Sequence, residues 1–193
     1  GDSKNVYLSS GFAAVVCAAY RAGKNVVVVK EDESPDGLED SEQSEGAAIQ
    51  RVDVWWSLHS MNISLMLALA VLTARNAGAD AVVTLKMLVD NEDARVGAEA
   101  EIKEFLKKER LDLSLEIYVR GDKPVFEMIA GSSSDADLVF MGMRAPENEE
   151  SPEDYSMYCG ALINQISPLP MVALVLAGED VDFAGLFASD SEL

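Results

Sequence analysis

The stretch that decides the fold is RVDVWWSLHSMNISLMLALAVLTARNAG, residues 51–78. It opens with β-branched and aromatic residues from Val52 to Trp56, which favour a β-strand. The polar residues Ser57, His59 and Ser60 interrupt the run, and an apolar helix-like segment then continues to the stop signal at Gly78. A second strand pattern, Ala81 to Val89, begins at once. The order predicts a β-α-β unit, which requires parallel strands and a right-handed crossover.

The apolar helix predicted from Met61 to Ala74 is too short to cross a membrane. It has about 14 residues, whereas a membrane span needs roughly 20. Apolar residues occupy nearly all its sides, which is typical of a helix covered on more than one face. We therefore expect it to lie between the sheet and a second covering surface, from another domain or another subunit.

Composition and charge exclude several classes of protein. The chain has 193 residues, 49% of them hydrophobic, and a formal net charge of -19. This charge disfavours binding to nucleic acid or to an anionic membrane surface, because phosphates require Lys and Arg. Two cysteines, Cys17 and Cys159, form neither a disulfide framework nor a zinc site, so we expect reduced thiols in a cytosolic compartment. The single histidine, His59, cannot build a histidine-rich metal site, and we expect it to be a polar surface residue.

The chain divides into four predicted segments. It starts at Gly1 without an initiator Met, which suggests a fragment of a larger protein. Residues 1–30 resemble the end of a first α/β subdomain, and residues 31–50 form an acidic linker that we expect to be disordered. The linker lacks the ligand spacing of an EF-hand calcium loop. Residues 51–177 form the main α/β subdomain, and residues 178–193 form an acidic tail, in which Phe183, Leu186 and Phe187 are spaced for one docked helical turn.

The remaining periodicities complete an alternating pattern. The segment NVVVVK, residues 25–30, predicts a strand buried on both faces. Asp122 is the predicted N-cap of a short helix with Pro124 in its first turn. From Arg51 to Ala177 the order is β-α-β-α-β-α-β-α-β, which predicts a doubly wound sandwich of five parallel strands. The other predicted helices are 11–22, 92–109 and 155–166, and the other predicted strands are 5–8, 113–119, 136–143 and 171–177.

Ligands of such sheets bind beyond the carboxyl ends of the strands. The residues at these ends are Ser57 to Ser60, Asp90 to Asp93, Arg120 to Asp122, and Gly142 to Arg144. None of them forms a P-loop, a three-glycine dinucleotide motif or a Gly-x-Ser-x-Gly nucleophile elbow. A carboxylate dyad of Asp90 and Asp122 is conceivable, but solvated loop acids or helix caps explain both residues more simply. We predict no catalytic, cofactor-binding or metal-binding residues.

This layout resembles the universal-stress-protein fold. In ATP-binding members of that family, a glycine-rich loop after the fourth strand and a following Gly-Ser or Gly-Thr hold phosphates. Gly142 keeps the first position, but Ala161 follows Gly160, and the loop APENEESPED is acidic. Carboxylates there would repel a nucleotide phosphate. We therefore expect the fold without its nucleotide site.

A closer resemblance covers nearly the whole chain, from about Gly11 to Phe187. VDVWW with its long apolar helix resembles the second half of the cytosolic C-terminal domain of cation–chloride cotransporters. RAGKNVVVVKEDE resembles the strand that closes the first half of that domain, and FEMIAGSSSDADLVFMGMRAP resembles its serine-rich turn and next strand. SPEDYSMYCGALINQISPLPMVALVLAGEDVDF resembles its last helix, proline turn and strand. SLHSMN replaces the glycine-rich acidic loop of animal members, so a prokaryotic or archaeal Na-K-Cl-type protein matches best.

The resemblance implies a cytoplasmic fragment whose parent lies in the cell membrane and moves chloride with sodium and/or potassium. The implied partners are a second copy, giving a homodimer, and the membrane domain of the same transporter. It implies a regulatory role without enzyme activity, cofactor, nucleotide or nucleic acid. The alternative is a soluble nucleotide-binding protein of the universal-stress type, with ATP or AMP at Gly142 and Gly160. Three serines lie in acidic loops, where they could be modified: Ser41, Ser44 and Ser151. The simpler interpretation is that they are ordinary solvent-exposed residues.

Overall fold

The computed structural model describes residues 10–31, 49–57, 61–78 and 81–178. Four predictions lie outside these residues: the strand at 5–8, most of the acidic linker, the environment of His59, and the tail after 178. Ser41, Ser44 and the three apolar tail residues lie outside them as well. Among the described residues, no helix combines the length and the apolarity that a membrane crossing needs.

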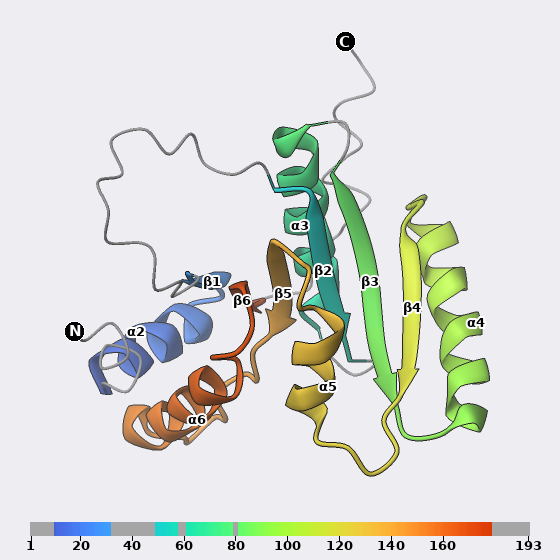
Figure 1. The fold of residues 1–193 in the computed structure, drawn as a ribbon. Coiled ribbons are helices and arrows are strands. Elements are labelled where there is room, and N and C mark those ends of the chain that lie inside the picture. The colour runs from blue at the N-terminus through green and yellow to red at the C-terminus, as the bar shows by residue number, and fades with distance from the viewer. Residues whose placement is uncertain (1–9, 32–48, 58–60, 79–80, 179–193) are drawn as a thin grey trace, which may run out of the picture.

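Helices and strands alternate from β2 onward, as the periodicity predicts (Figure 1). The predicted main elements are present, with boundaries shifted by no more than three residues. The elements are α2 (Ser10–Arg21), β1 (Val26–Lys30), β2 (Arg51–Trp56), α3 (Ile63–Ala77), β3 (Val82–Val89), α4 (Glu92–Lys108), β4 (Ser114–Val119), α5 (Val125–Ser132), β5 (Leu138–Gly142), α6 (Pro152–Gln165) and β6 (Met171–Leu176).

All the described strands belong to one six-stranded sheet of order β1-β6-β5-β2-β3-β4. The five strands from β2 to β6 are parallel, which confirms the α/β class and the parallel core of the sheet. β1 is antiparallel to β6, with Val26 opposite Leu176. The prediction of five strands plus part of a separate unit therefore needs correction, because β1 extends the same sheet.

The prediction that β1 is buried on both faces is wrong. Val26 and Val28 pack against the core beneath α2 and α6, but Val27 and Val29 are 45% and 48% exposed. A run of four valines favours a strand without indicating how many of its faces are covered. Gly178 holds this edge closely against the rest of the fold, since a Cβ there would lie 2.6 Å from the backbone carbon of Gly23.

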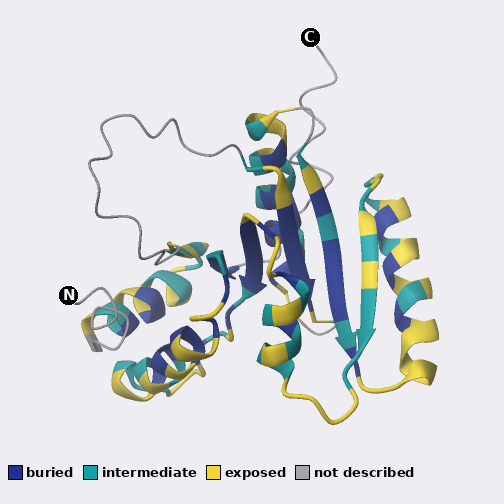
Figure 2. Ribbon diagram, in the orientation of Figure 1, coloured by how far each residue is buried: buried dark blue, intermediate teal, exposed yellow. Residues whose placement is uncertain are grey.

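Two apolar cores lie on opposite faces of the sheet. Helices α3 and α4 contribute to one, and α2, α5 and α6 contribute to the other. The central strands are buried along most of their length, whereas the edge strand β4 is only partly covered (Figure 2). Seven of the 15 residues of α3 are buried, and its exposed positions lie in its C-terminal half. Contact of α3 with another subunit stays a prediction.

Helix caps agree only partly with the sequence patterns. Asp122 is not the N-cap of α5, which is Pro124. Gly121 adopts a φ of 57°, and Lys123 donates its backbone N–H to the carbonyl of Arg120, so Asp122 lies within a tight turn before the helix. α4 has a side-chain cap, because the amide oxygen of Asn91 accepts from the N–H of Ala94 at 2.9 Å.

Candidate functional site

A cleft of about 430 Å³ lies at the carboxyl ends of the central strands. It includes the point between β2 and β5 where the strand order reverses, the usual ligand crevice of open α/β sheets. Apolar side chains from the strands and from α5 form most of its lining: Trp55, Met87, Val89, Val125, Phe126 and Ile129.

The polar groups of this cleft are few and incompletely paired. Arg120 Nη2 lies 3.1 Å from Asp90 Oδ1, and both residues line the cleft. Arg120 Nε and Trp56 Nε1 are buried and have no hydrogen-bond acceptor among the described residues. Since a buried N–H without an acceptor is uncommon and costly, these two donors require an explanation.

The adjacent tryptophans serve opposite faces of the sheet. The indole N–H of Trp55 donates to Ser133 Oγ at 2.9 Å, and its ring lies 5.8 Å from that of Tyr118. The ring of Trp56 lies 5.0 Å from that of Phe105 on α4. Both residues are among those that line the cleft, so the VDVWW motif supplies part of its lining.

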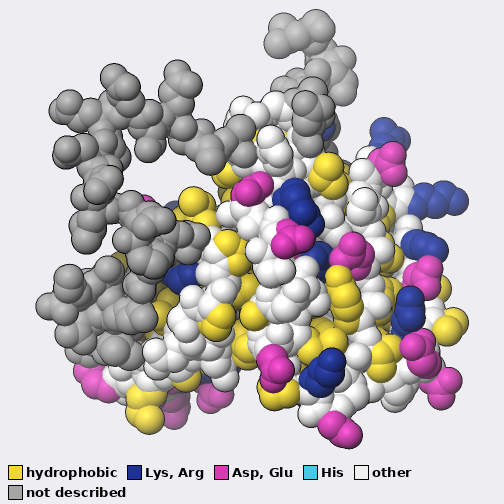
Figure 3. All heavy atoms as spheres, in the orientation of Figure 1, with side chains coloured by type: hydrophobic (Ala, Val, Ile, Leu, Met, Phe, Trp, Pro, Cys, Tyr) yellow, Lys and Arg dark blue, Asp and Glu magenta, His cyan; other side chains and the backbone are white. Residues whose placement is uncertain are grey.

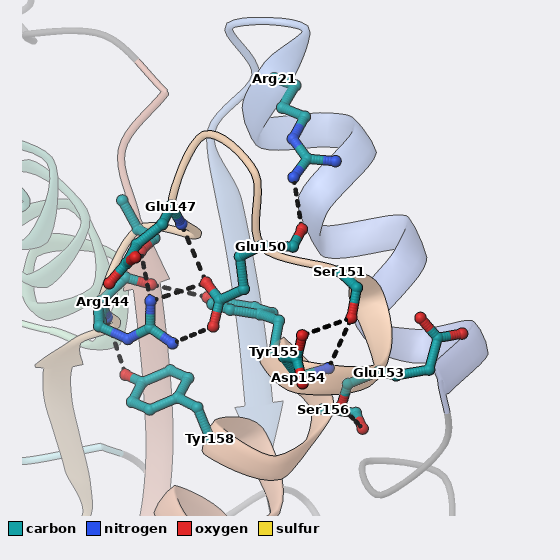
Figure 4. A network of polar contacts seen from close by, with 11 residues as sticks. Arg21, Arg144, Glu147, Glu150, Ser151, Glu153, Asp154, Tyr155, Ser156 and Tyr158 are labelled. Carbon is teal, nitrogen blue, oxygen red and sulfur yellow. Dashed lines mark hydrogen bonds and ion pairs between the residues drawn. The ribbon is translucent and has the colours of Figure 1, made fainter.

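The loop between β5 and α6 is closed by its own side chains (Figure 4). Arg144 donates through Nη1 and Nη2 to the two carboxylate oxygens of Glu150, at 2.8 and 2.7 Å. The backbone N–H of Glu147 donates to the same carboxylate at 2.9 Å, and Arg21 Nη2 on α2 donates to the carbonyl of Glu150 at 2.8 Å. The side chain of Glu150 is only 13% exposed, so these donors enclose most of its carboxylate.

Two tyrosines of α6 fix Arg144 beneath this loop. Tyr155, which is fully buried, donates to the carbonyl of Arg144 at 2.7 Å. The backbone N–H of Arg144 donates to the hydroxyl of Tyr158 at 2.8 Å, and the guanidinium lies 4.6 Å from the centre of that ring. Burial raises the pKa of both tyrosines. The start of α6 is also capped internally, because Ser151 Oγ accepts from the N–H of Asp154 at 3.1 Å.

The charge of Glu150 is strongly stabilised. Hydrogen bonds from Arg144 lower the pKa of this carboxyl group to about 2. The sequence led us to expect that acidic side chains repel phosphate at this loop. In the structure, Glu150 accepts hydrogen bonds from Arg144 and from the backbone N–H of Glu147, and Ser151 caps α6.

A buried ion pair lies on the α5 face of the sheet. Lys86 Nζ is 2.8 Å from Asp53 Oδ2 and 3.5 Å from Glu116 Oε2, and it also donates to the carbonyl of Ser132. Three partners match the three N–H donors of an ammonium group. Tyr118 donates to Glu116, and burial raises the pKa of that tyrosine to about 12. This fully paired cluster stabilises strand packing and has no unpaired nucleophile.

The structure brings the first residue of each predicted strand end to the cleft: Ser57, Asp90, Arg120 and Gly142. Asp90 pairs with Arg120, whereas Asp122 is exposed in the turn that precedes α5. Gly142 and Ser57 line the cleft, but Gly160 is buried within α6. Within the described ranges, no group of three or more His, Cys, Asp and Glu side chains could hold a metal ion. Cys17 and Cys159 are buried free thiols, and burial raises the pKa of each.

One important polar residue had no predicted role. Asn62, which precedes α3, is 6% exposed. Its amide nitrogen donates to the carbonyl of Met143 at 2.9 Å, and its amide oxygen accepts from the N–H of Ala177 at 2.8 Å. It therefore ties the ends of β5 and β6 to α3. The sequence signal that could have indicated this role was a polar residue directly before an apolar helix.

No protein-family model and no curated protein matches this chain.

Proposed function

We propose that this chain is a cytosolic regulatory and dimerisation domain of a cation–chloride cotransporter. The parent protein would lie in the cell membrane and move chloride together with sodium and/or potassium. The resemblance of VDVWW and the later segments to that family is the basis of this proposal. A homodimer and the membrane domain of the same transporter are the expected partners.

The finer assignment of the fold, a universal-stress-protein-like sandwich, belongs to the same proposal. Five parallel strands whose order reverses between β2 and β5 support it. Helices on both faces of the sheet support it as well.

The single observation that favours a regulatory domain over a nucleotide-binding protein is the closed β5–α6 loop. Arg144 holds both oxygens of Glu150, and Ser151 caps α6, so the position expected for nucleotide phosphates is already occupied. Figure 3 also shows acidic side chains interspersed with the Lys and Arg side chains on the α4 side of this face, without a continuous basic surface for a polyanion.

Equilibrium sedimentation with and without magnesium ATP, together with a thermal melt, tests this domain role. We expect concentration-dependent self-association and no shift in melting temperature with ATP. Saturable stabilisation by ATP, which would reach several kcal/mol far above the Kd, would favour the nucleotide-binding alternative. Glu150→Gln is the matched variant, because it removes the internal anion while keeping the size of the side chain.

The transport assignment needs a separate test. The open reading frame that encodes this chain should also encode membrane-spanning segments. Its full product in liposomes should take up chloride only when sodium or potassium is present. Chloride uptake that is indifferent to both cations would contradict the proposal.

A further inference from the structure

We propose that the C-terminal segment, residues 179–193, packs its apolar side chains across the valine face of β1, which Val27 and Val29 form. This contact does not depend on the cotransporter assignment. Three observations support it: the exposure of the two valines, the position of the last described residue, and the opposite charges of the two segments.

The apolar core on the α3 side of the sheet continues under β1 without a described cover. Val27 lies opposite Val175 and Val29 lies opposite Ala173, and both partners are buried members of that core. The two valines of β1 are nevertheless 45% and 48% exposed. Because burial of apolar surface is favourable in proportion to its area, a segment placed over these valines would extend the core to the edge of the sheet.

The last residue that the structure describes, Gly178, lies beside the start of β1. Its backbone N–H donates to Oδ1 of Asn25 at 3.0 Å, and a Cβ on it would lie 2.7 Å from the backbone of Lys24. Val175, the partner of Val27, is three residues earlier, which is about 10 Å along the strand. The five residues that follow Gly178 span up to about 17 Å when extended, so the segment can reach the valine face.

The two segments carry opposite charges. Residues 10–30 contain three basic residues and no acidic residue: Arg21, Lys24 and Lys30. Residues 179–193 contain five acidic residues and no basic residue: Glu179, Asp180, Asp182, Asp190 and Glu192. The first two acids directly follow the glycine that contacts the backbone of Lys24. Attraction between these charges favours a course of the C-terminal segment along β1.

The apolar residues of the C-terminal segment also match the valine face better than other candidate segments do. Phe183, Leu186 and Phe187 have the i, i+3, i+4 spacing that places side chains on one face of a helical turn. Residues 32–48 contain Leu38 as their only large hydrophobic residue. Residues 1–9 precede α2, which packs on the opposite face of β1.

Methyl NMR of the full chain tests this contact, because an aromatic ring shifts the proton resonances of methyl groups packed against it. The variant combines Phe183→Leu with Phe187→Leu, which removes both rings of the segment and keeps its apolar character. We expect the methyl resonances of Val27 and Val29 to shift. Val96 is the matched control and should not shift, since it is an exposed valine on α4 near the opposite edge of the sheet.

Two results would overturn the proposal. The first is that the methyl resonances of Val27 and Val29 in the double variant change no more than those of Val96. The second is that dilution of the unmodified chain shifts these resonances in the same way as the double variant does, which would mean that a second copy supplies the rings. Unchanged amide resonances of Val26 and Val28 verify that β1 itself is intact in the variant.

Discussion

The strand-end cleft and the β5–α6 loop lie along the same edge of the sheet, but they satisfy their polar groups differently. In the loop, Glu150 is paired with Arg144, and the main chain of Arg144 is bonded to two tyrosines. Two cleft-lining residues, Trp56 and Arg120, each have a buried N–H group without an acceptor in the part of the chain that the structure describes. The polar groups of the loop are therefore paired within the chain, whereas those of the residues around the cleft are only partly paired.

The largest expected effect is a difference in unfolding free energy between truncating a packed side chain beneath the loop and truncating one that borders the cleft. Tyr155→Ala should cost about 3–5 kcal/mol of unfolding free energy, because it empties a fully buried position and removes a hydrogen bond. Phe126→Ala should cost clearly less, since Phe126 is half-buried and already borders an open cleft. Urea unfolding of both variants measures the difference. Equal losses would contradict the contrast between a packed and an open region.

The next effect concerns the residue that joins the end of β5 to the end of β6. Asn62→Ala leaves the N–H of Ala177 and the carbonyl of Met143 without their partner. Each buried unpaired group costs about 1–3 kcal/mol, so a loss of several kcal/mol is expected in urea unfolding. Asn76→Ala, at an exposed position of the same helix, is the control and should change stability by less than about 0.5 kcal/mol.

The two arginines give a sharper comparison. Arg144→Met should destabilise the protein by about 1–3 kcal/mol, because Glu150 loses both guanidinium donors. Arg120→Met should change stability by less than about 0.5 kcal/mol, because it breaks only an exposed pair and removes an unpaired buried N–H. Thermal and urea unfolding measure both variants. A greater loss in Arg120→Met would mean that the cleft is also part of the stabilising framework.

The smallest expected effect is a dependence of the unfolding free energy on pH that is limited to acidic solution. The pKa of Glu150 is depressed to about 2 from its ordinary 4.5, so its stabilisation is complete above about pH 4.5. It is lost as the pH falls from there towards 2. Glu150→Gln should therefore show a flatter fall in unfolding free energy over this window than the unmodified chain. Parallel profiles for the two proteins would show that the ionised carboxylate does not stabilise the loop.

The sequence predicted the parallel core of the sheet because its signals are local. Alternation between β-branched strand segments and helical periodicity, with stops at Gly78 and the prolines after α6, was sufficient to place all eleven described elements within three residues of their observed bounds. It also indicated the edge of the sheet at which such folds bind ligands, since parallel strands end at a common edge, although it predicted no binding residues there. The sequence did not predict which donors would be left unpaired there.

The sequence by itself determined the order of elements, the acidic character of the chain and the absence of a glycine-rich phosphate loop. The tertiary structure alone decided where β1 pairs, since four successive valines are compatible with a central strand or an edge strand. It also decided that Lys86 lies beside Asp53, and that Glu150 turns inward to Arg144. The first contact joins residues that are distant in sequence, and the second joins two side chains of the same loop. Their register and burial depend on how the sheet and helices pack, which no local pattern contains.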